Sequence, residues 1–227
     1  MQAENELSLS NYIARVMRRV YGKMSLGLLV TALTSFAVLS SPSIMSVLFS
    51  HQAVFWVLMA VELGLVIAIS AAINKLSTAT ATALFYLYSV VNGIVLTPIF
   101  MVYTMSSIGF TFLITSLTFG AMTIFGYVTK QDLTKFGAIL FMGLIGLIIC
   151  SLVNIFLQSS ALEWGISIVG VLIFVGLTAW DTQKIKEMAS MADQSQVGKV
   201  ATLGALSLYL DFINLFLYLL RFFGSRD

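Results

Sequence analysis

The chain has 227 residues, of which 59% are hydrophobic and only 10% are charged, and its formal net charge is +2. A soluble domain carries roughly 25% charged residues on its wet surface, so this composition excludes a soluble protein and indicates one whose surface faces lipid. No basic run suited to a phosphate backbone is present, which excludes nucleic acid as a partner. Cys150 is the single cysteine, so we expect neither an internal disulfide nor a thiolate metal site.

Polar and basic residues fill positions 1–23, ahead of the first apolar stretch. A cleavable signal peptide would instead place an apolar run before a small-residue cleavage site. We therefore expect no such peptide, and we expect the first span to act as its own insertion signal. The predicted organisation is a polar cytoplasmic segment at 1–23, one transmembrane domain at 24–224 and a short tail at 225–227.

Seven stretches are long and apolar enough to cross a membrane, which takes about 20 residues in a helix. The connections between them are short, apart from residues 181–199, and no second domain or internal repeat is evident. The predicted fold class is an all-α membrane protein with seven transmembrane helices. Their approximate bounds are 24–41, 53–73, 80–103, 107–128, 136–157, 163–180 and 200–223.

The basic residues are sorted along the chain, and their places predict an orientation. Ten of the twelve lie before the first span or in the loops after the second, fourth and sixth spans. By the positive-inside rule, these loops and the amino terminus are cytoplasmic. Arg221 and Arg226 depart from this rule. Either a short tail with two arginines is tolerated on the far side, or the last segment re-enters the membrane or crosses it only in part.

Small residues and one proline shape the contacts expected between spans, because small side chains let helices approach closely in lipid. In the third span, Asn92 and Gly93 precede Pro98. Proline removes a backbone hydrogen bond, so we expect a kink there, either as plain architecture or as a hinge for gating. The glycines expected at helix contacts in the fifth and sixth spans are Gly137, Gly143, Gly146, Gly165, Gly170 and Gly176.

Three acidic residues lie within a span or at its edge: Glu62, Asp181 and Asp211. An acidic residue at the centre of an isolated helix costs about 2.5–3.5 kcal/mol on insertion scales, and it usually faces a bundle interior or a water path. Apart from Arg221 at the end of the last one, no Lys, Arg or His falls inside the predicted spans, and His51 is expected in an interfacial loop. The carboxylates must therefore bind or share a proton, bind a metal cation or reach water, unless a basic side chain reaches in from a helix end.

A polar seam accompanies the aspartate of the last span. Its members are spaced by four, three and four residues, which places them on one face of a helix. The seam is either hydrogen-bonding glue between helices or part of a functional site, and the ionisation cost favours function for the aspartate. The members are Ser207, Asp211, Asn214 and Tyr218.

Asp181 allows two interpretations. It could end the sixth span in water, one turn from Lys184, or the helix could continue toward Met188 and turn the carboxylate to the last span. Two carboxylates in contact share a proton and titrate as a unit. The second arrangement would form a proton-sensitive latch that needs no histidine.

Enzyme mechanisms can be tested for the residues that they need. A serine-type intramembrane protease needs a His or Lys base, and a zinc protease needs a His-Glu-x-x-His motif, and neither is present. Asp181 and Asp211 could share a proton as an aspartic-protease dyad does. That hypothesis stays open, although neither residue lies in a Gly-x-Gly-Asp setting.

The stretch from Ala205 to Gly224 resembles the last helix of the Bax inhibitor-1 family, especially its bacterial calcium-leak members. Further stretches resemble other motifs of this family and occur in the expected order over nearly the whole chain. They are Asn92–Ile99, Thr118–Phe125, Lys130–Leu133, Asn154–Phe156 and Trp180–Ile185.

The resemblance implies a seven-helix fold in which the other six helices surround the last one, and a pH-sensitive calcium leak. It implies that aspartates matching Asp181 and Asp211 bond to each other and close the path, and that Glu62 contacts the ion route. Bacterial relatives carry an arginine near the position of Ile73, where this chain offers only the adjacent Asn74 and Lys75. The pH range over which those relatives open and close therefore cannot be assigned to this chain from the resemblance.

Together these inferences predict a passive, pH-sensitive Ca²⁺ leak in a bacterial inner membrane, with no cofactor beyond the permeant ion. Membrane lipid, Ca²⁺ and protons are the expected partners. Asp181, Asp211 and Glu62 are the candidate weak Ca²⁺ contacts, because Ca²⁺ takes several oxygen ligands. The alternatives are an intramembrane aspartyl protease and a non-conducting membrane regulator that acts through protein partners.

Overall fold

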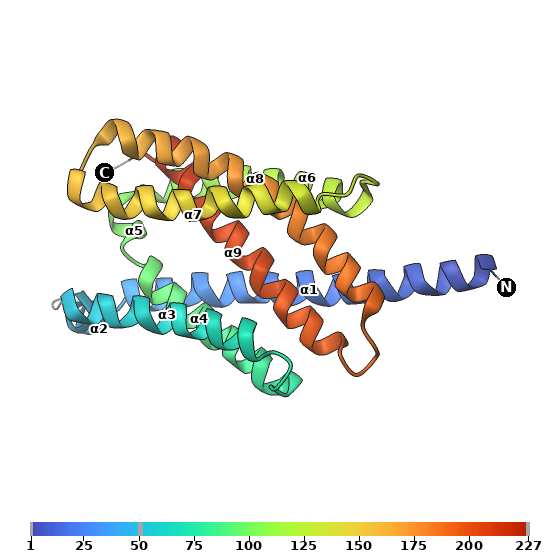
Figure 1. Cartoon of the computed structure of the whole chain (residues 1–227). Coiled ribbons are helices and arrows are strands. Elements are labelled where there is room, and N and C mark those ends of the chain that lie inside the picture. Colours follow the sequence, from blue (N-terminus) through green and yellow to red (C-terminus); the bar gives the residue numbers. More distant parts are fainter. Residues whose placement is uncertain (1, 50–51, 226–227) are drawn as a thin grey trace. The chain divides into compact units, whose positions relative to one another are not determined.

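The structure, a computed structural model, describes residues 2–49 and 52–225, and all of its regular elements there are helices (Figure 1). His51 and Arg226 lie outside these residues. The helices are α1 (Gln2–Leu39), α2 (Pro42–Phe49), α3 (Gln52–Ala72), α4 (Thr78–Leu96), α5 (Ile99–Val102), α6 (Met105–Val128), α7 (Thr134–Leu157), α8 (Ser160–Met191) and α9 (Val197–Phe223).

Seven of the described segments are long and apolar enough to cross a membrane, which confirms the predicted fold class. They are α1 from Leu9 onward, α3, α4 together with α5, and each helix from α6 to α9. The last helix is the most enclosed: 67% of its most apolar stretch is buried, compared with 11–44% in the other six. Its 27 residues form one unbroken helix of roughly 40 Å, long enough for a full crossing.

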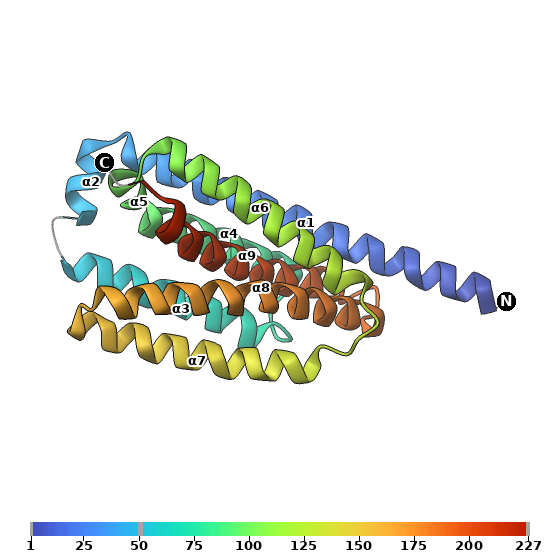
Figure 2. The ribbon, with the colours of Figure 1, turned by 90° about the horizontal axis from the view of Figure 1, so that it is seen from above.

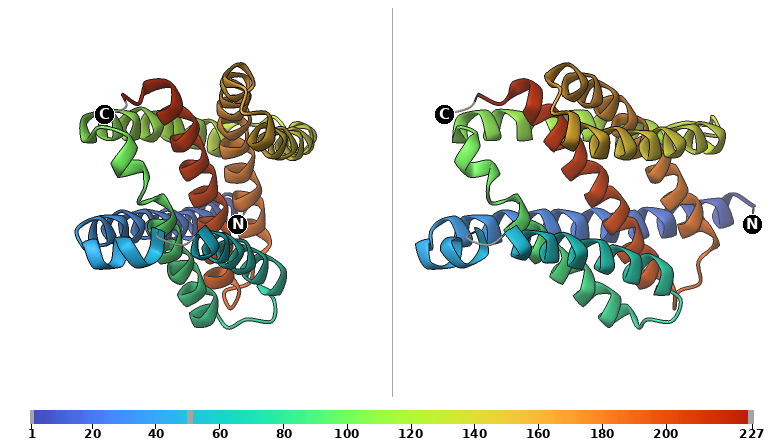
Figure 3. Two further views of the ribbon diagram at one scale, coloured as in Figure 1. Left: turned by 90° about the vertical axis from the view of Figure 1, so that its left-hand side faces the viewer. Right: turned by 60° about the vertical axis from the view of Figure 1, so that its left-hand side comes forward.

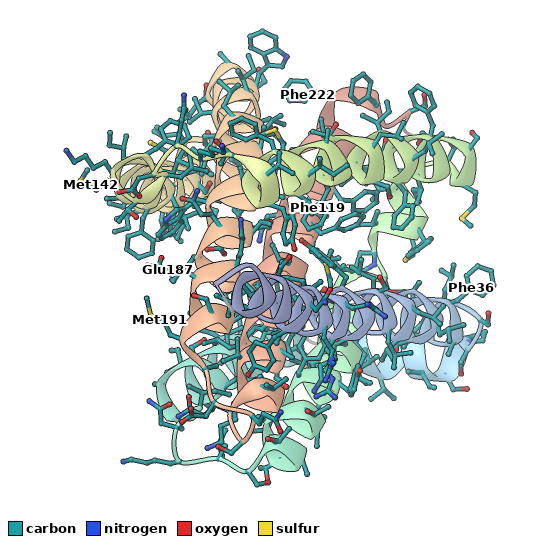
Figure 4. All side chains as sticks on the ribbon, turned by 90° about the vertical axis from the view of Figure 1, so that its right-hand side faces the viewer. Phe36, Phe119, Met142, Glu187, Met191 and Phe222 are labelled. Carbon is teal, nitrogen blue, oxygen red and sulfur yellow. The ribbon has the colours of Figure 1, made fainter. Side chains whose placement is uncertain are left out.

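Large apolar side chains cover the outer surface of the helices. Phe36 on α1 is 53% exposed, Met142 on α7 is 63% exposed, and both point away from the ribbon (Figure 4). A soluble protein rarely exposes contiguous apolar patches of this kind. Lipid is the solvent that such a surface fits.

The chain forms two compact units, and α8 and α9 each contribute to both. Unit 1 comprises Met1–Val102 and Glu187–Tyr209, and unit 2 comprises Tyr103–Lys186 and Leu210–Asp227. The two units are described separately below.

In unit 1, α4 packs against both α1 and α3, and Figure 2 shows α1 as one long helix. The contact between α1 and α4 uses Gly93, because a Cβ there would lie 2.6 Å from the Thr31 carbonyl oxygen. Phe85 and Tyr209 are fully buried, with ring centroids 5.8 Å apart. A close helix contact at a glycine and a pair of packed aromatic rings thus contribute to the core of this unit.

In unit 2, glycines again mark the places where helices meet. Four of the six glycines predicted at helix contacts lie against another helix: Gly137, Gly143, Gly170 and Gly176. The prediction is wrong for Gly146 and Gly165, which face open space. The tightest contact with another backbone is at Gly126 on α6, where a Cβ would lie 2.2 Å from the Ala179 carbonyl oxygen.

Two segment boundaries differ from the predicted ones. α8 continues to Met191 (Figure 3), so the connection expected at 181–199 shrinks to residues 192–196. At the amino terminus, α1 begins at Gln2, so the polar residues before position 24 continue the helix of the first span. Polar residues lower the hydropathy at both places, and the predicted spans therefore end there, but the helices themselves continue.

The kink expected at Pro98 is an interruption of the helix. α4 ends at Leu96, the Thr97 hydroxyl donates to the Gly93 carbonyl oxygen at 3.0 Å, and the four-residue α5 follows. Since proline has no N–H group to continue the ladder, the third candidate span consists of two helical pieces.

Substitution of Gly126 tests the packing of unit 2. Gly126→Ala is expected to lower the free energy of unfolding by about 1–3 kcal/mol, the usual cost of overpacking. The added methyl group would clash with the Ala179 carbonyl oxygen and force α6 and α8 further apart. Gly120→Ala on the same helix is the matched control, since nothing lies within 4 Å of its Cβ position. Thermal melting of the detergent-purified protein, followed by size-exclusion chromatography, measures both variants. Equal melting temperatures would contradict this packing.

Candidate functional site

Asp211 is the most enclosed acidic residue that the structure describes. It lies on α9 in unit 2, only 4% exposed, and its Oδ2 atom is buried with no hydrogen-bond partner. Phe212, Ile213 and Leu215, its neighbours on the same helix, are also buried. Most of the apolar stretch of α9 is buried, and Asp211 near its middle therefore has very little contact with the surroundings of the protein.

Asp181 lies on α8, also in unit 2, and its charge acts on Asp211. The helix continues ten residues beyond Asp181 to Met191, so the interpretation of Asp181 as a solvated helix end is wrong. Asp181 is half-buried. The second interpretation fits this placement: the carboxylate lies within electrostatic reach of the last span.

Lys184 does not neutralise this pair of aspartates directly. Its charge acts on Asp181, but its Nζ atom lies over the Trp180 ring, 4.9 Å from the centroid. Trp180 in turn packs against Gly137. The tryptophan therefore holds the lysine in a cation–π contact, and in the described residues no ion pair joins Lys184 to Asp181.

The other members of the polar seam differ in their surroundings. The Asn214 amide donates to the Leu210 carbonyl oxygen of its own helix at 2.8 Å, so this N–H does not join two helices. Tyr218 packs on Gly170 and stacks on Phe174, with centroids 5.9 Å apart. Ser207 is half-buried and belongs to unit 1.

Glu62 belongs to unit 1, where it has a neutral partner. The Asn92 Nδ2 atom donates to Glu62 Oε1 at 2.7 Å. The Tyr209 hydroxyl donates to Asn92 Oδ1 at 2.9 Å and also bonds the Thr31 hydroxyl. Hydrogen bonds therefore run from α9 and α1 through Asn92 to the carboxylate on α3.

The Asn92 amide is the centre of this network. Its oxygen accepts the tyrosine proton, so its NH₂ group must face Glu62. Sequence reasoning noted Asn92 as a helix-contact residue but missed Tyr209 and Thr31 as partners. The only available signal was the alignment of Asn92 and Glu62 at the middle of adjacent spans, because partners on separate helices depend on packing.

The first candidate span contains four basic residues that were expected ahead of it, Arg15, Arg18, Arg19 and Lys23, of which Lys23 lies deepest. Lys23 falls inside the first candidate span, Leu9–Leu39, although the sequence placed it ahead of that span. Its Nζ atom donates to the hydroxyl groups of Thr82 and Thr202, the latter at 2.8 Å. The expectation that no basic residue lies in a span is therefore wrong for α1, and the candidate spans of α7, α8 and α9 also contain basic residues near their ends.

The region near Ile73, where relatives are expected to carry an arginine, also lies in unit 1. Ile73 is buried and Lys75 is exposed. Lys199 from α9 donates to the Asn74 carbonyl oxygen at 2.9 Å. The basic residue that bonds the backbone next to Ile73 is thus Lys199, and among the described residues no hydrogen bond from the Lys75 side chain is found.

The three carboxylates do not form a preformed metal centre. Within residues 2–49 and 52–225, no three His, Cys, Asp or Glu side chains gather closely enough to hold a metal ion. A tightly bound Ca²⁺ would need six to eight oxygen ligands.

A double-mutant cycle tests the Glu62 network. Asn92→Leu and Tyr209→Phe are each expected to lower the free energy of unfolding, by about 1–3 kcal/mol, because each strands a polar partner. The double mutant should lose less than the sum, because one change already breaks the shared bond. Thermal melting in detergent at fixed pH measures the coupling, and strictly additive losses would show that the two side chains do not interact.

Comparison with known proteins finds a family model and several relatives that match nearly the whole chain. Residues 13–227 match the family model described as "Inhibitor of apoptosis-promoting Bax1". The Inner membrane protein YbhL of Escherichia coli K12 is 50% identical over 213 residues, which cover 92% of this chain and 91% of YbhL. A protein of Borreliella burgdorferi is 49% identical over 227 residues, covering 99% of this chain and 97% of the relative.

A third relative, protein RP147 of Rickettsia prowazekii, is 44% identical over 215 residues, which cover 94% of this chain and 91% of RP147. The likeness to YbhL over almost its full length supports an integral inner membrane protein. With its family match from residue 13 to the last residue, the chain belongs to the Bax inhibitor-1 family of membrane proteins.

Proposed function

We propose that this protein is a passive, pH-gated Ca²⁺ leak in the inner membrane, with Asp181 and Asp211 as its latch and its amino terminus in the cytoplasm. The observation that carries the proposal is the burial of Asp211 with an unpartnered carboxylate oxygen, next to a second carboxylate that acts on it. A structural role alone would be served by an amide, which has no ionisation cost.

A shared proton explains how such a latch would respond to pH. Two carboxylates with one proton between them form a strong hydrogen bond, and loss of that proton leaves two like charges that repel. The proton-sharing form is the closed one, and separation of the pair opens the path. Asp181 lies within the continuous helix α8, ten residues before its end, so a change at this pair is transmitted to a rigid element.

Passive permeation fits the rest of the chain. The sequence contains no phosphate-binding loop that would supply energy from a nucleotide. Carboxylates suit Ca²⁺, and a small number of them gives weak binding, which lets the ion leave again. Glu62, held by Asn92, is the third candidate contact along the route.

Flux measurements with Asp211→Asn test the latch. Purified protein in liposomes is expected to conduct Ca²⁺ with a rate that changes several-fold between about pH 5 and pH 8, where a shared proton can be lost. Asp211→Asn should abolish most of this pH dependence, because an amide cannot release a proton. A Ca²⁺-sensitive dye inside the liposomes reports the rate.

Asp132→Asn provides the matched control. Asp132 is exposed in the loop before α7, outside the candidate spans, and its hydrogen bond with Thr134 lowers the pKa of its carboxyl group. Its charge is therefore constant over the same pH range, and this variant should behave as wild type. If wild type conducts no faster than empty liposomes, the leak itself is disproved.

The aspartyl protease is the second candidate, because the same pair of aspartates could share a catalytic proton. Asp211→Asn would impair both functions, so it does not separate them. A transmembrane reporter in the same liposomes does: the leak predicts ion flux with an intact reporter, and the protease predicts cleavage without flux. A non-conducting regulator would tolerate neutralisation of Asp181 and fail when its surface loops are changed.

A further inference from the structure

Arg221 is a feature that the proposed leak does not use. It lies in the last turn of α9, at the end of a span where the positive-inside rule predicts few basic residues. Its surroundings in unit 2 contain an acidic counterpart and open space, and together these point to a ligand.

Two cavities adjoin Arg221, and Glu163 lines both of them. The smaller, of about 150 Å³, also has Trp164 and Phe222 in its wall. The larger, of about 470 Å³, also has Asn154 and Gln158 in its wall. Both cavities belong to unit 2, at the ends of α7, α8 and α9. Because Arg221 and Glu163 line both cavities, we regard the two cavities as one site with two lobes.

The charges of this site are available to a ligand. Arg221 and Glu163 are both exposed, and in the described residues neither is part of an ion pair. The Arg221 guanidinium lies over the Tyr218 ring, 5.4 Å from the centroid. Stacking of this kind fixes the plane of the guanidinium while its N–H groups stay free to donate. A cation and an anion thus flank the site without neutralising each other directly.

The turn after α7 directs further polar groups to the larger cavity. Gln158 has a φ of 48°, in the left-handed region that residues other than glycine rarely adopt. Its N–H donates to the Asn154 carbonyl oxygen at 2.8 Å, and the next N–H, of Ser159, donates to Asn154 Oδ1 at 3.0 Å. These bonds hold the turn, so the side chains on this wall of the cavity have a defined position.

The depth of the site in the membrane identifies the kind of ligand. Glu163 lies in the first turn of α8 and Arg221 in the last turn of α9, so both lie where a span meets the headgroup region. Trp164 is 63% exposed and meets Phe222 edge to face at 6.3 Å, and Figure 4 shows Phe222 at this end of α9. Exposed aromatic side chains are typical of that interface.

Phospholipid headgroups with both charges match this arrangement. A phosphate accepts the paired N–H groups of an arginine, and a primary ammonium donates to a carboxylate. We propose that the two cavities bind the headgroup of a phosphoethanolamine lipid, with its phosphate on Arg221 and its ammonium on Glu163. The acyl chains then lie on the exposed apolar faces of α7 and α8, where Phe156 and Val169 are exposed. This site does not depend on the Ca²⁺ leak.

Native mass spectrometry of the full chain in detergent tests the site. Phosphatidylethanolamine, phosphatidylglycerol and phosphatidylcholine with identical acyl chains are offered in equal amounts. Wild type is expected to retain phosphatidylethanolamine about tenfold better than the other two, the effect of one charge-assisted hydrogen bond. Phosphatidylglycerol lacks the ammonium, and phosphatidylcholine has no N–H to donate.

Two variants separate the roles of the charges. Glu163→Gln should remove the preference for phosphatidylethanolamine while phosphatidylglycerol still binds, and Arg221→Gln should weaken all three lipids. Lys135→Gln and Asp132→Asn, both exposed and near the other end of α7, should bind as wild type does. Thermal melting without lipid identifies a variant that fails to fold, and lipid-induced stabilisation then replaces mass spectrometry for that variant.

Three outcomes would overturn the proposal: equal retention of the three lipids by wild type, an unchanged preference in Glu163→Gln, or an equal loss in Lys135→Gln. Soluble phosphoethanolamine distinguishes the source of the headgroup. It should stabilise the protein far less than the lipid does, because it has no chains to bury. Equal stabilisation would show a site for a free zwitterion and would overturn the assignment to a lipid.

Discussion

The burial of the Asp211 carboxylate is the constraint on which the account depends. A charged oxygen without a hydrogen-bond partner in an enclosed helix is expensive, and the residues around it on α9 are apolar. The described part of unit 2 places a second carboxylate, Asp181, within electrostatic reach of it. Such an arrangement is tolerated only if a proton, a cation or a change in shape relieves it. In the proposed leak, each of these responses would be a step of gating.

Close helix packing surrounds α8 just before Asp181. Gly126 and Gly137 allow α6 and α7 to touch α8 near Ala179 and Trp180, just before Asp181. Trp180 then holds the Lys184 amine over its ring, and the lysine makes no direct ion pair with the aspartate. Glycine packing in unit 2 therefore supports the unusual electrostatics of the site. Glu62 in unit 1 has different surroundings. Its carboxylate accepts a hydrogen bond from Asn92, and Asn92 in turn accepts one from Tyr209.

Part of this arrangement could be predicted from the sequence. Apolar stretches of about 20 residues identify the seven spans, since lipid solvates only such surfaces. The position of Asp211 near the centre of an apolar run identifies it as the residue with the highest burial cost. The helical spacing of the seam further predicts which face of α9 is polar. These features depend only on local sequence and on the solvent.

Features that depend on contacts between helices could not be predicted. Hydropathy falls at Asp181 although α8 continues to Met191, because hydropathy reports contact with lipid and not the end of a helix. The bond between Asn92 and Tyr209 depends on the relative rotation of α4 and α9, which no local pattern encodes. Gln158 in the left-handed region, where glycine is usual, and Lys23 inside the first candidate span are further examples.

The distance between the carboxyl groups of Asp181 and Asp211, measured in experimental structures at two pH values, tests the central claim most directly. The account predicts a hydrogen-bonded pair, with oxygens about 2.5–2.7 Å apart, at the pH where the leak is closed. It predicts carboxyl groups out of hydrogen-bonding contact at the pH where the leak conducts. The same separation at both pH values, with Ca²⁺ flux that still differs, would contradict it.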